Sequence, residues 1–102
     1  MFGLGNLFGA RSNRIDPATA ARLVAGGAML LDVRTPQEFA GGAAKGAVNI
    51  PVQQLATRIG ELPRNRPIVA YCRSGARSAS AVASLVSAGY DAHDAGALGN
   101  VL

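Results

Sequence analysis

The residues that build disulfides and metal clusters are scarce in this sequence. Its 102 residues include one cysteine, Cys72, one histidine, His93, and no tryptophan. A single cysteine excludes an internal disulfide and a C-x-x-C redox pair, and Cys72 with His93 supplies too few ligands for a zinc site of these residue types. We therefore expect neither a metal nor a cofactor. Because a free thiol persists best in a reducing compartment, we expect a cytoplasmic protein.

An uninterrupted apolar run long enough to cross a membrane is also missing. The N-terminal stretch 1–10 is apolar, but glycines and an asparagine interrupt it and no cation precedes Arg11. It fits neither a signal peptide nor a membrane span, so stable membrane insertion is not expected. Residues 1–14 are predicted to form a flexible arm, with weak contact to a membrane or a partner as the alternative. Residues 15–102 are predicted to form one domain.

Acidic residues and aromatic residues are few. Ten Lys and Arg residues stand against six Asp and Glu residues, a net charge of +4, and nine of the ten cations are arginines. This balance favours a small anionic substrate or an acidic protein partner. Nucleic-acid binding is not expected, because the sequence has no basic helix and its five aromatic residues are not interleaved with cations.

Short apolar runs alternate with helix signals along the domain. Strands are predicted over residues 28–33, 48–50, 67–71 and 90–93. Helices are predicted to begin at Pro17 and Pro36, where Asp16 caps the first and Thr35 forms a capping box with Glu38. Further helices are predicted over residues 52–62 and 78–88, and Phe39 is predicted to lie in the core. Strands alternating with helices indicate an α/β fold, a small open parallel sheet of four or five strands with helices on both faces.

Cys72 stands where a predicted strand meets a predicted helix. Apolar residues recur at 79, 82, 83 and 86 after it, the spacing of a helix that buries one face. The positive end of that helix and its unpaired N–H groups favour an anion such as a thiolate. Arg73 and Arg77 add positive charge, and Gly75 permits the positive φ of an anion-binding nest. We interpret Cys72 as an activated nucleophile; the alternative is a buried structural thiol.

Three motifs together carry a resemblance to a known family. The segment 71–79, YCRSGARSA, resembles the active-site loop of rhodanese-type sulfurtransferases. Residues 30–39 are similar to the Asp-Val-Arg segment of that family, and residues 46–51 are similar to the segment that follows it. The resemblance covers residues 15–98 and suggests a single-domain rhodanese-like protein, a thiosulfate sulfurtransferase.

The resemblance implies a covalent sulfur mechanism. Cys72 would attack the outer sulfur of thiosulfate or a related sulfane donor, sulfite would leave, and a persulfide would remain. A thiophilic acceptor, cyanide or a thiol, would then take the terminal sulfur. The substrate would be held by the loop after the cysteine, which consists of Arg73, Ser74, Gly75, Ala76 and Arg77.

Three further polar residues are interpreted as structural neighbours of the site. Asp32, at the end of a predicted strand, is expected to order the following loop, with a direct catalytic role as the alternative. Arg34 and Glu38 are interpreted as structural, and the two could pair with each other. The stretch 43–45, Ala-Ala-Lys, departs from the bulkier His-Ile-Pro-like segment common in the family, which leaves the fold intact and alters the pocket wall.

Three other functions compete with sulfur transfer. A sulfur carrier or protein-interaction module with little turnover would also use this fold. Phosphatases and arsenate reductases resemble rhodaneses too, but their cysteine loops are one residue longer than the C-x-x-x-x-R loop from Cys72 to Arg77. A protease-like pair of Cys72 with His93 would require the two side chains to meet. The physiological donor and acceptor are not specified by the sequence.

Overall fold

The apolar runs form four parallel strands in one open sheet. The structure, a computed structural model, describes residues 13–102. The strands are β1 (Met29–Asp32), β2 (Val48–Asn49), β3 (Ile68–Cys72) and β4 (Ala92–Ala97), in the order β2-β1-β3-β4. Because all are parallel, Asp32, Cys72 and Ala97 end their strands at the same edge of the sheet. The predicted open parallel α/β sheet is confirmed.

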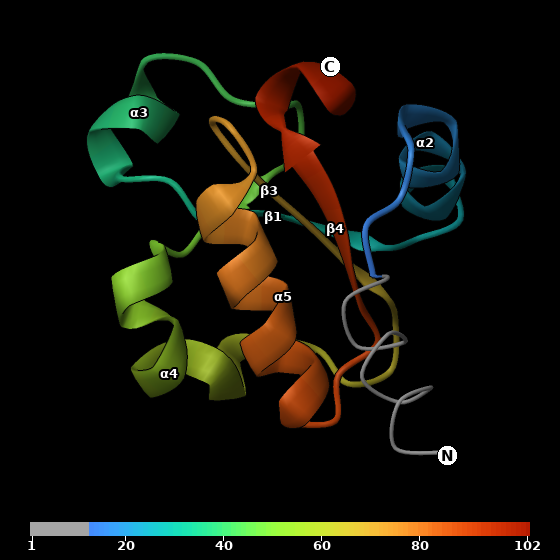
Figure 1. The fold of residues 1–102 in the computed structure, drawn as a ribbon, viewed down its shortest axis with the longest axis vertical. Coiled ribbons are helices and arrows are strands. Elements are labelled where there is room, and N and C mark those ends of the chain that lie inside the picture. Colours follow the sequence, from blue (N-terminus) through green and yellow to red (C-terminus); the bar gives the residue numbers. More distant parts are fainter. Residues whose placement is uncertain (1–12) are drawn as a thin grey trace.

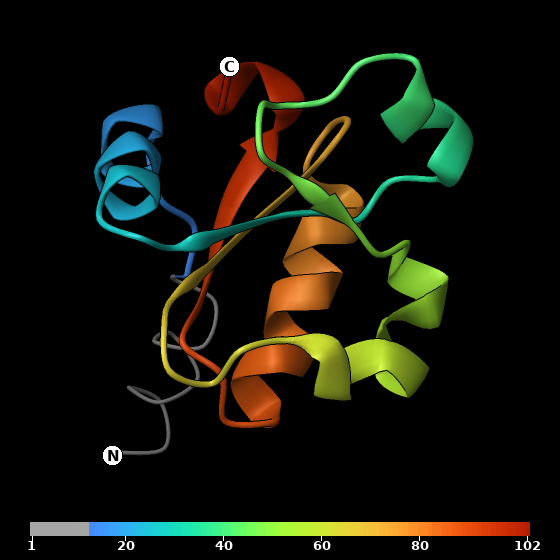
Figure 2. The same cartoon turned by 180° about the vertical axis from the view of Figure 1, so that it is seen from behind.

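Helices cover both faces of this sheet. Helix α2 (Pro17–Ala25) lies on one face, and α4 (Leu55–Arg58) and α5 (Ala76–Ser87) lie on the other, as Figures 1 and 2 show from opposite sides. The short helix α3 (Pro36–Ala40) follows β1 beyond the carboxyl edge of the sheet. Within residues 13–102, no helix combines the length and the apolar character needed to cross a bilayer.

Alternate residues of the central strands face opposite helices, which explains why these strands read as continuous apolar runs. Leu31, Ile68 and Cys72 belong to the cluster under α5 and α4, to which α5 contributes the fully buried Leu85. Their neighbours along each strand belong to the cluster under α2: Leu30, Val69 and Tyr71. Cys72 thus ends a strand that is buried on both sides.

The predicted helix starts have the caps that the sequence indicates. The Asp16 side chain accepts the Thr19 N–H at 2.7 Å and Pro17 is the first residue of α2. At α3, the Thr35 hydroxyl accepts the Glu38 N–H, and the Glu38 carboxylate accepts the Thr35 N–H. Caps of this kind stabilise a helix by roughly 1 kcal/mol each. Phe39, predicted in the core, is only partly buried.

Two predicted elements differ from the observed ones. The helix predicted over 52–62 is broken into 3₁₀ turns (Val52–Gln54 and Ile59–Glu61) on either side of α4, although its spacing does bury Leu55 and Leu62. The strand predicted at 90–93 is β4, which begins at Ala92 and continues to Ala97. It passes through Asp94 and Gly96 because a bulge at this point, with Gly96 at φ +81°, accommodates an extra residue.

The chain before α2 already pairs with the sheet. The Asp94 N–H donates to the Asn13 carbonyl, and the Ile15 N–H donates to the Asp94 carbonyl. Arg14 lies between them, and its guanidinium covers Gly96, where a Cβ atom would collide with it. The arm predicted over residues 1–14 therefore overlaps the sheet edge at Asn13 and Arg14, and its remaining residues, 1–12, lie outside the described part of the chain.

Tyr71 provides a test of how the loop at residues 43–46 is held to the sheet. Its buried hydroxyl accepts the buried Ala44 N–H at 3.1 Å. Tyr71→Phe leaves that N–H without a partner, which should lower the free energy of unfolding by about 1 to 3 kcal/mol in chemical denaturation. Tyr90→Phe is the matched control, since the Tyr90 hydroxyl donates to the Ile59 carbonyl in a hydrogen bond that is only partly buried. Equal losses in both variants would contradict this account.

Candidate active site

Cys72 is the last residue of β3 and lies directly before the turn into α5. Its side chain is fully buried, and Gly75 caps the helix with φ +107°. Only glycine adopts such a φ readily, so the turn from strand to helix depends on the residue at this position. The thiol lies at the N-terminus of a helix, as predicted. Helix α5 begins at Ala76, two residues before the predicted start at residue 78.

Two backbone N–H groups point at the sulfur atom. The Gly75 N–H lies 3.0 Å and the Ser78 N–H 3.3 Å from Cys72 Sγ. These groups belong to the cap and first turn of α5, where N–H groups lack partners within the helix. They therefore solvate a negative charge on sulfur, and the positive end of the helix dipole adds to the effect.

The pKa of the thiol reflects two opposed influences. Burial is the largest and raises the pKa of Cys72 by disfavouring the charged form. Hydrogen bonds from the backbone N–H groups of Ser78, Gly75 and Ser74 act in the other direction and lower the pKa. The net result is a pKa below the ordinary value of a cysteine, as a nucleophilic thiol requires.

The two arginines of the loop have different surroundings. Arg77 forms a forked ion pair with Glu38, its Nη1 and Nη2 atoms lying 2.7 Å and 3.1 Å from the carboxylate oxygens. Arg73 is exposed and lines a cavity of about 500 Å³ together with Gly42, Ala43 and Leu98. The loop thus presents one arginine that α3 holds in place and one that is open to solvent. Ser74 and Ala76, also predicted in the site, are exposed.

Asp32 and Arg34 form a buried ion pair beside the site. Arg34 contacts both carboxylate oxygens, with Nη2 2.7 Å from Oδ2, and Asp32 Oδ1 accepts the Arg34 N–H. The same Nη2 donates to the Gly42 carbonyl. Asp32 therefore orders the loop after β1, as predicted. The predicted pairing of Arg34 with Glu38 is wrong, because Arg34 forms its ion pair with Asp32 and Glu38 forms its ion pair with Arg77.

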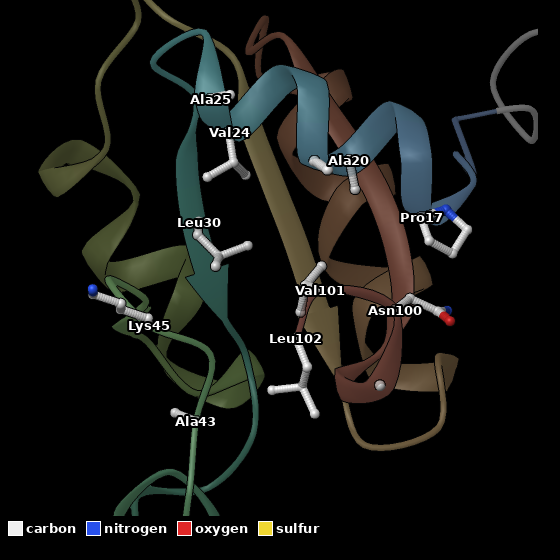
Figure 3. A pocket seen from close by; sticks show the side chains of 12 residues that line it. Pro17, Ala20, Val24, Ala25, Leu30, Ala43, Lys45, Asn100, Val101 and Leu102 are labelled. Atoms are coloured by element: carbon white, nitrogen blue, oxygen red, sulfur yellow. The ribbon is translucent and has the colours of Figure 1, made fainter.

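The stretch 43–45 contributes little bulk to the pocket wall. Ala43 lines the cavity beside Arg73, whereas Ala44 is buried against Tyr71. Lys45 lines a second cavity of about 700 Å³ between α2 and the C-terminal residues, and Ala43 lines this cavity as well (Figure 3). Apolar side chains such as Val24, Leu30 and Val101 line this second cavity, and Cys72 lines neither cavity.

Two functional candidates were missed by the sequence analysis. Ser78 and Asp94 are buried behind Cys72, and the Ser78 hydroxyl lies 2.8 Å from Asp94 Oδ1. One signal was available: an Asp two residues before a Gly often accepts the backbone N–H of that glycine, as Asp94 does from Gly96. His93 pairs with Asp91 and lies opposite Val69 in the sheet, three positions before Cys72, so the protease-like pair does not form.

The Glu38–Arg77 pair generates a testable pH dependence. The Arg77 side chain, followed by the Thr35 N–H, lowers the pKa of Glu38 to about 2 from 4.5. A lowered pKa means that the pair stabilises the fold above pH 4.5 and that this contribution disappears as the pH falls towards 2. Glu38→Gln should therefore melt at a lower temperature than the wild type at neutral pH, and the difference should shrink on acidification.

Glu61→Gln is the matched control for that experiment. Glu61 pairs with Arg58 through a more exposed contact, in which 56% of the Glu61 side chain is accessible against 26% for Glu38. Exposed pairs contribute little to stability, so this variant should melt close to the wild type. A difference between Glu38→Gln and wild type that stays constant from pH 7 to acid would contradict the pairing account.

Comparison with known proteins agrees with this geometry. A family model described as a rhodanese-like domain matches residues 16–97. A sulfurtransferase of Allochromatium vinosum is 45% identical over 62 residues, which cover 61% of this chain and 58% of that protein, less than two thirds of its length. The thiosulfate sulfurtransferase GlpE of Pseudomonas entomophila is 36% identical over 77 residues, covering 76% of this chain and 71% of that protein.

The solved structures give the same result for the fold. A rhodanese-related protein from Thermoplasma volcanium superposes with a TM-score of 0.76 at 30% identity, over 82% of this chain and 83% of that chain. The family model spans all four strands and the Cys72 turn. The chain therefore belongs to the rhodanese-like domain family.

Proposed function

We propose that this protein is a sulfurtransferase that carries a sulfur atom on Cys72 and uses thiosulfate or a related sulfane compound as donor. The observation that carries the proposal is the pair of N–H groups, from Gly75 and Ser78, directed at Cys72 Sγ. They favour the thiolate, which is the nucleophilic form of cysteine. The sulfurtransferase names of the relatives support the same reaction class.

The proposed reaction has two half-reactions on one enzyme. The Cys72 thiolate attacks the outer sulfur of thiosulfate, the S–S bond of thiosulfate breaks, and its electron pair leaves with sulfite. The persulfide left on Cys72 carries one negative charge on its outer sulfur. An acceptor, cyanide or a thiolate, then attacks that outer sulfur and the Cys72 thiolate leaves. Two half-reactions that share one enzyme form produce ping-pong kinetics.

The buried position of Cys72 has a consequence for the second half-reaction. Sγ itself is fully buried, and a second sulfur extends the side chain by about 2 Å, the length of an S–S bond. The acceptor then needs to reach only the outer sulfur. The N–H groups of the loop and the end of α5 stabilise the anionic persulfide as they do the thiolate.

Arg73 and Arg77 are proposed to hold the anionic end of the donor. Arg73 is exposed and lines the 500 Å³ cavity, and the Arg77 side chain, which Glu38 holds, is partly accessible. Guanidinium groups bind the oxygens of sulfonate-like anions through forked, charge-assisted hydrogen bonds. A donor with such an end is therefore preferred over a neutral one. A reducing compartment such as the cytoplasm would keep the single thiol available.

Mass spectrometry tests the covalent step. After incubation with thiosulfate, the wild type should gain the mass of one sulfur atom and lose it again when cyanide is added. Cys72→Ser should do neither, since its hydroxyl is a far weaker nucleophile at neutral pH. Thiocyanate production by Cys72→Ser at the wild-type level would disprove the mechanism. Turnover of aryl phosphates or arsenate that depends on Cys72 would move the protein to the phosphatase class instead.

Steady-state kinetics test the arginines. Arg73→Ala and Arg77→Ala should each raise KM for thiosulfate roughly tenfold, the equivalent of about 1.4 kcal/mol, and should weaken its dependence on salt. Arg66→Ala is the matched control, because Arg66 is an exposed arginine near the start of β3, at the opposite end from Cys72. It removes the same net charge from the protein. An unchanged KM in both loop variants, or an equal rise in Arg66→Ala, would remove the arginines from the substrate site.

A further inference from the structure

Three buried side chains form a row behind the nucleophile. Cys72 Sγ lies 3.5 Å from the Ser78 hydroxyl oxygen, which in turn lies 2.8 Å from Asp94 Oδ1. Cys72 and Ser78 are fully buried and Asp94 is 6% exposed. A carboxylate this well buried is costly unless its hydrogen bonds are satisfied, and the proposed sulfur transfer assigns it no part.

The Ser78 hydroxyl has a single hydrogen and more than one acceptor near it. Asp94 Oδ1 is at 2.8 Å, the Gly75 carbonyl is at 3.1 Å and Cys72 Sγ is at 3.5 Å. Hydrogen bonds to an ionised carboxylate are shorter and about twice as strong as neutral ones. The hydrogen is therefore held by Asp94, and the hydroxyl turns its lone pairs to the sulfur.

That orientation of the Ser78 hydroxyl favours the neutral thiol of Cys72 over the thiolate. A thiol donates its S–H to the Ser78 oxygen and completes a chain that ends on Asp94. A thiolate instead faces the lone pairs of the Ser78 oxygen, which repel it. The negative charge of Asp94 lies behind that oxygen. A negative charge near a buried thiol disfavours ionisation of that thiol. The two N–H groups of α5 and the buried carboxylate thus act in opposite directions on one sulfur.

The backbone holds Asp94 in this position from two sides. Its carboxylate accepts the Gly96 N–H at 2.8 Å, and its own N–H and C=O pair with Asn13 and Ile15. The other charged groups near the sulfur are arginines: Arg77 on α5, which Glu38 engages, and Arg14, whose guanidinium covers Gly96. Asp94 is the acidic group that reaches the sulfur through one hydroxyl.

We propose that Asp94 is a positioning residue that acts on Cys72 through Ser78, holding the hydroxyl hydrogen away from the sulfur so that the free thiolate is disfavoured. The persulfide escapes this penalty, because its negative charge lies on the outer sulfur, one bond farther from Asp94. Asp94 therefore favours the sulfur-loaded form over the free thiolate and opposes loss of the sulfur before an acceptor arrives. This consequence rests on the proposed sulfur transfer, whereas the effect on the free thiol does not.

Titration of the free thiol tests the proposal without any sulfur donor. Asp94→Asn removes the negative charge and leaves a neutral oxygen that accepts more weakly, so the Ser78 hydroxyl hydrogen is held less strongly and can turn to the sulfur. The midpoint of thiolate formation, followed by ultraviolet absorbance and by the rate of iodoacetamide alkylation, should fall by about one pH unit. Asp91→Asn is the matched control: Asp91 is an exposed carboxylate just before β4 that contacts His93. Its midpoint should match the wild type.

Ser78→Ala supplies a second, independent measurement. If Asp94 holds the hydroxyl hydrogen, Ser78→Ala removes only an acceptor for the S–H group of Cys72. Because that acceptor stabilises the neutral thiol, the midpoint of thiolate formation should fall or stay unchanged. A higher midpoint in Ser78→Ala would mean that the hydroxyl donates to the thiolate in the wild type, which overturns the proposal. An unchanged or higher midpoint in Asp94→Asn overturns it as well. Loss of thiosulfate turnover with the expected midpoints would count against the proposed function alone.

Discussion

The site depends on two backbone N–H groups, from Gly75 and Ser78, that converge on one sulfur atom. They converge because β3 ends at Cys72 and the chain enters α5 within three residues, a turn that needs the positive φ of Gly75. Packing of both faces of β3 fixes the strand, and packing of Leu85 and Val82 fixes the helix, so the N–H groups cannot follow the sulfur if it moves. The stabilisation of negative charge is therefore built into the backbone before any substrate binds.

Two ion pairs near this turn connect separate elements of the fold. Asp32 forms an ion pair with Arg34, which also donates to the Gly42 carbonyl in the next loop. Glu38 of α3 forms an ion pair with Arg77 of α5. Each pair holds a loop at the carboxyl edge of the sheet, where parallel α/β folds collect their functional groups. Asp94 differs from these acidic residues, because its carboxylate is held by a hydroxyl and a backbone N–H and lies behind the nucleophile. The balance between N–H groups and carboxylate sets how readily Cys72 ionises.

Local sequence signals predicted the elements well where they act within a few residues. The caps at Asp16 and Thr35 and the glycine before α5 follow from side-chain or backbone geometry spanning three or four positions. The prediction was wrong where a tertiary contact decides the outcome. Asp94 and Gly96 resemble a turn, but pairing with β3 on one side and with Asn13 and Ile15 on the other extends the strand through them. The helical spacing of apolar residues at 52–62 correctly indicated which residues pack against the core, but the segment does not form one continuous helix.

The fold class, the position of Cys72 at a strand-to-helix turn and the capping roles follow from local sequence, because apolar periodicity and short-range hydrogen bonding are encoded over a few neighbouring residues. The choice of charge partners does not, because it depends on how distant segments pack. Arg77 meets Glu38 across 39 positions, and Ser78 meets Asp94 across 16, so no local pattern distinguishes these partners from others. Their distances depend on how α3, α5 and β4 pack at one edge of the sheet, and the ionisation of a buried sulfur depends on those distances.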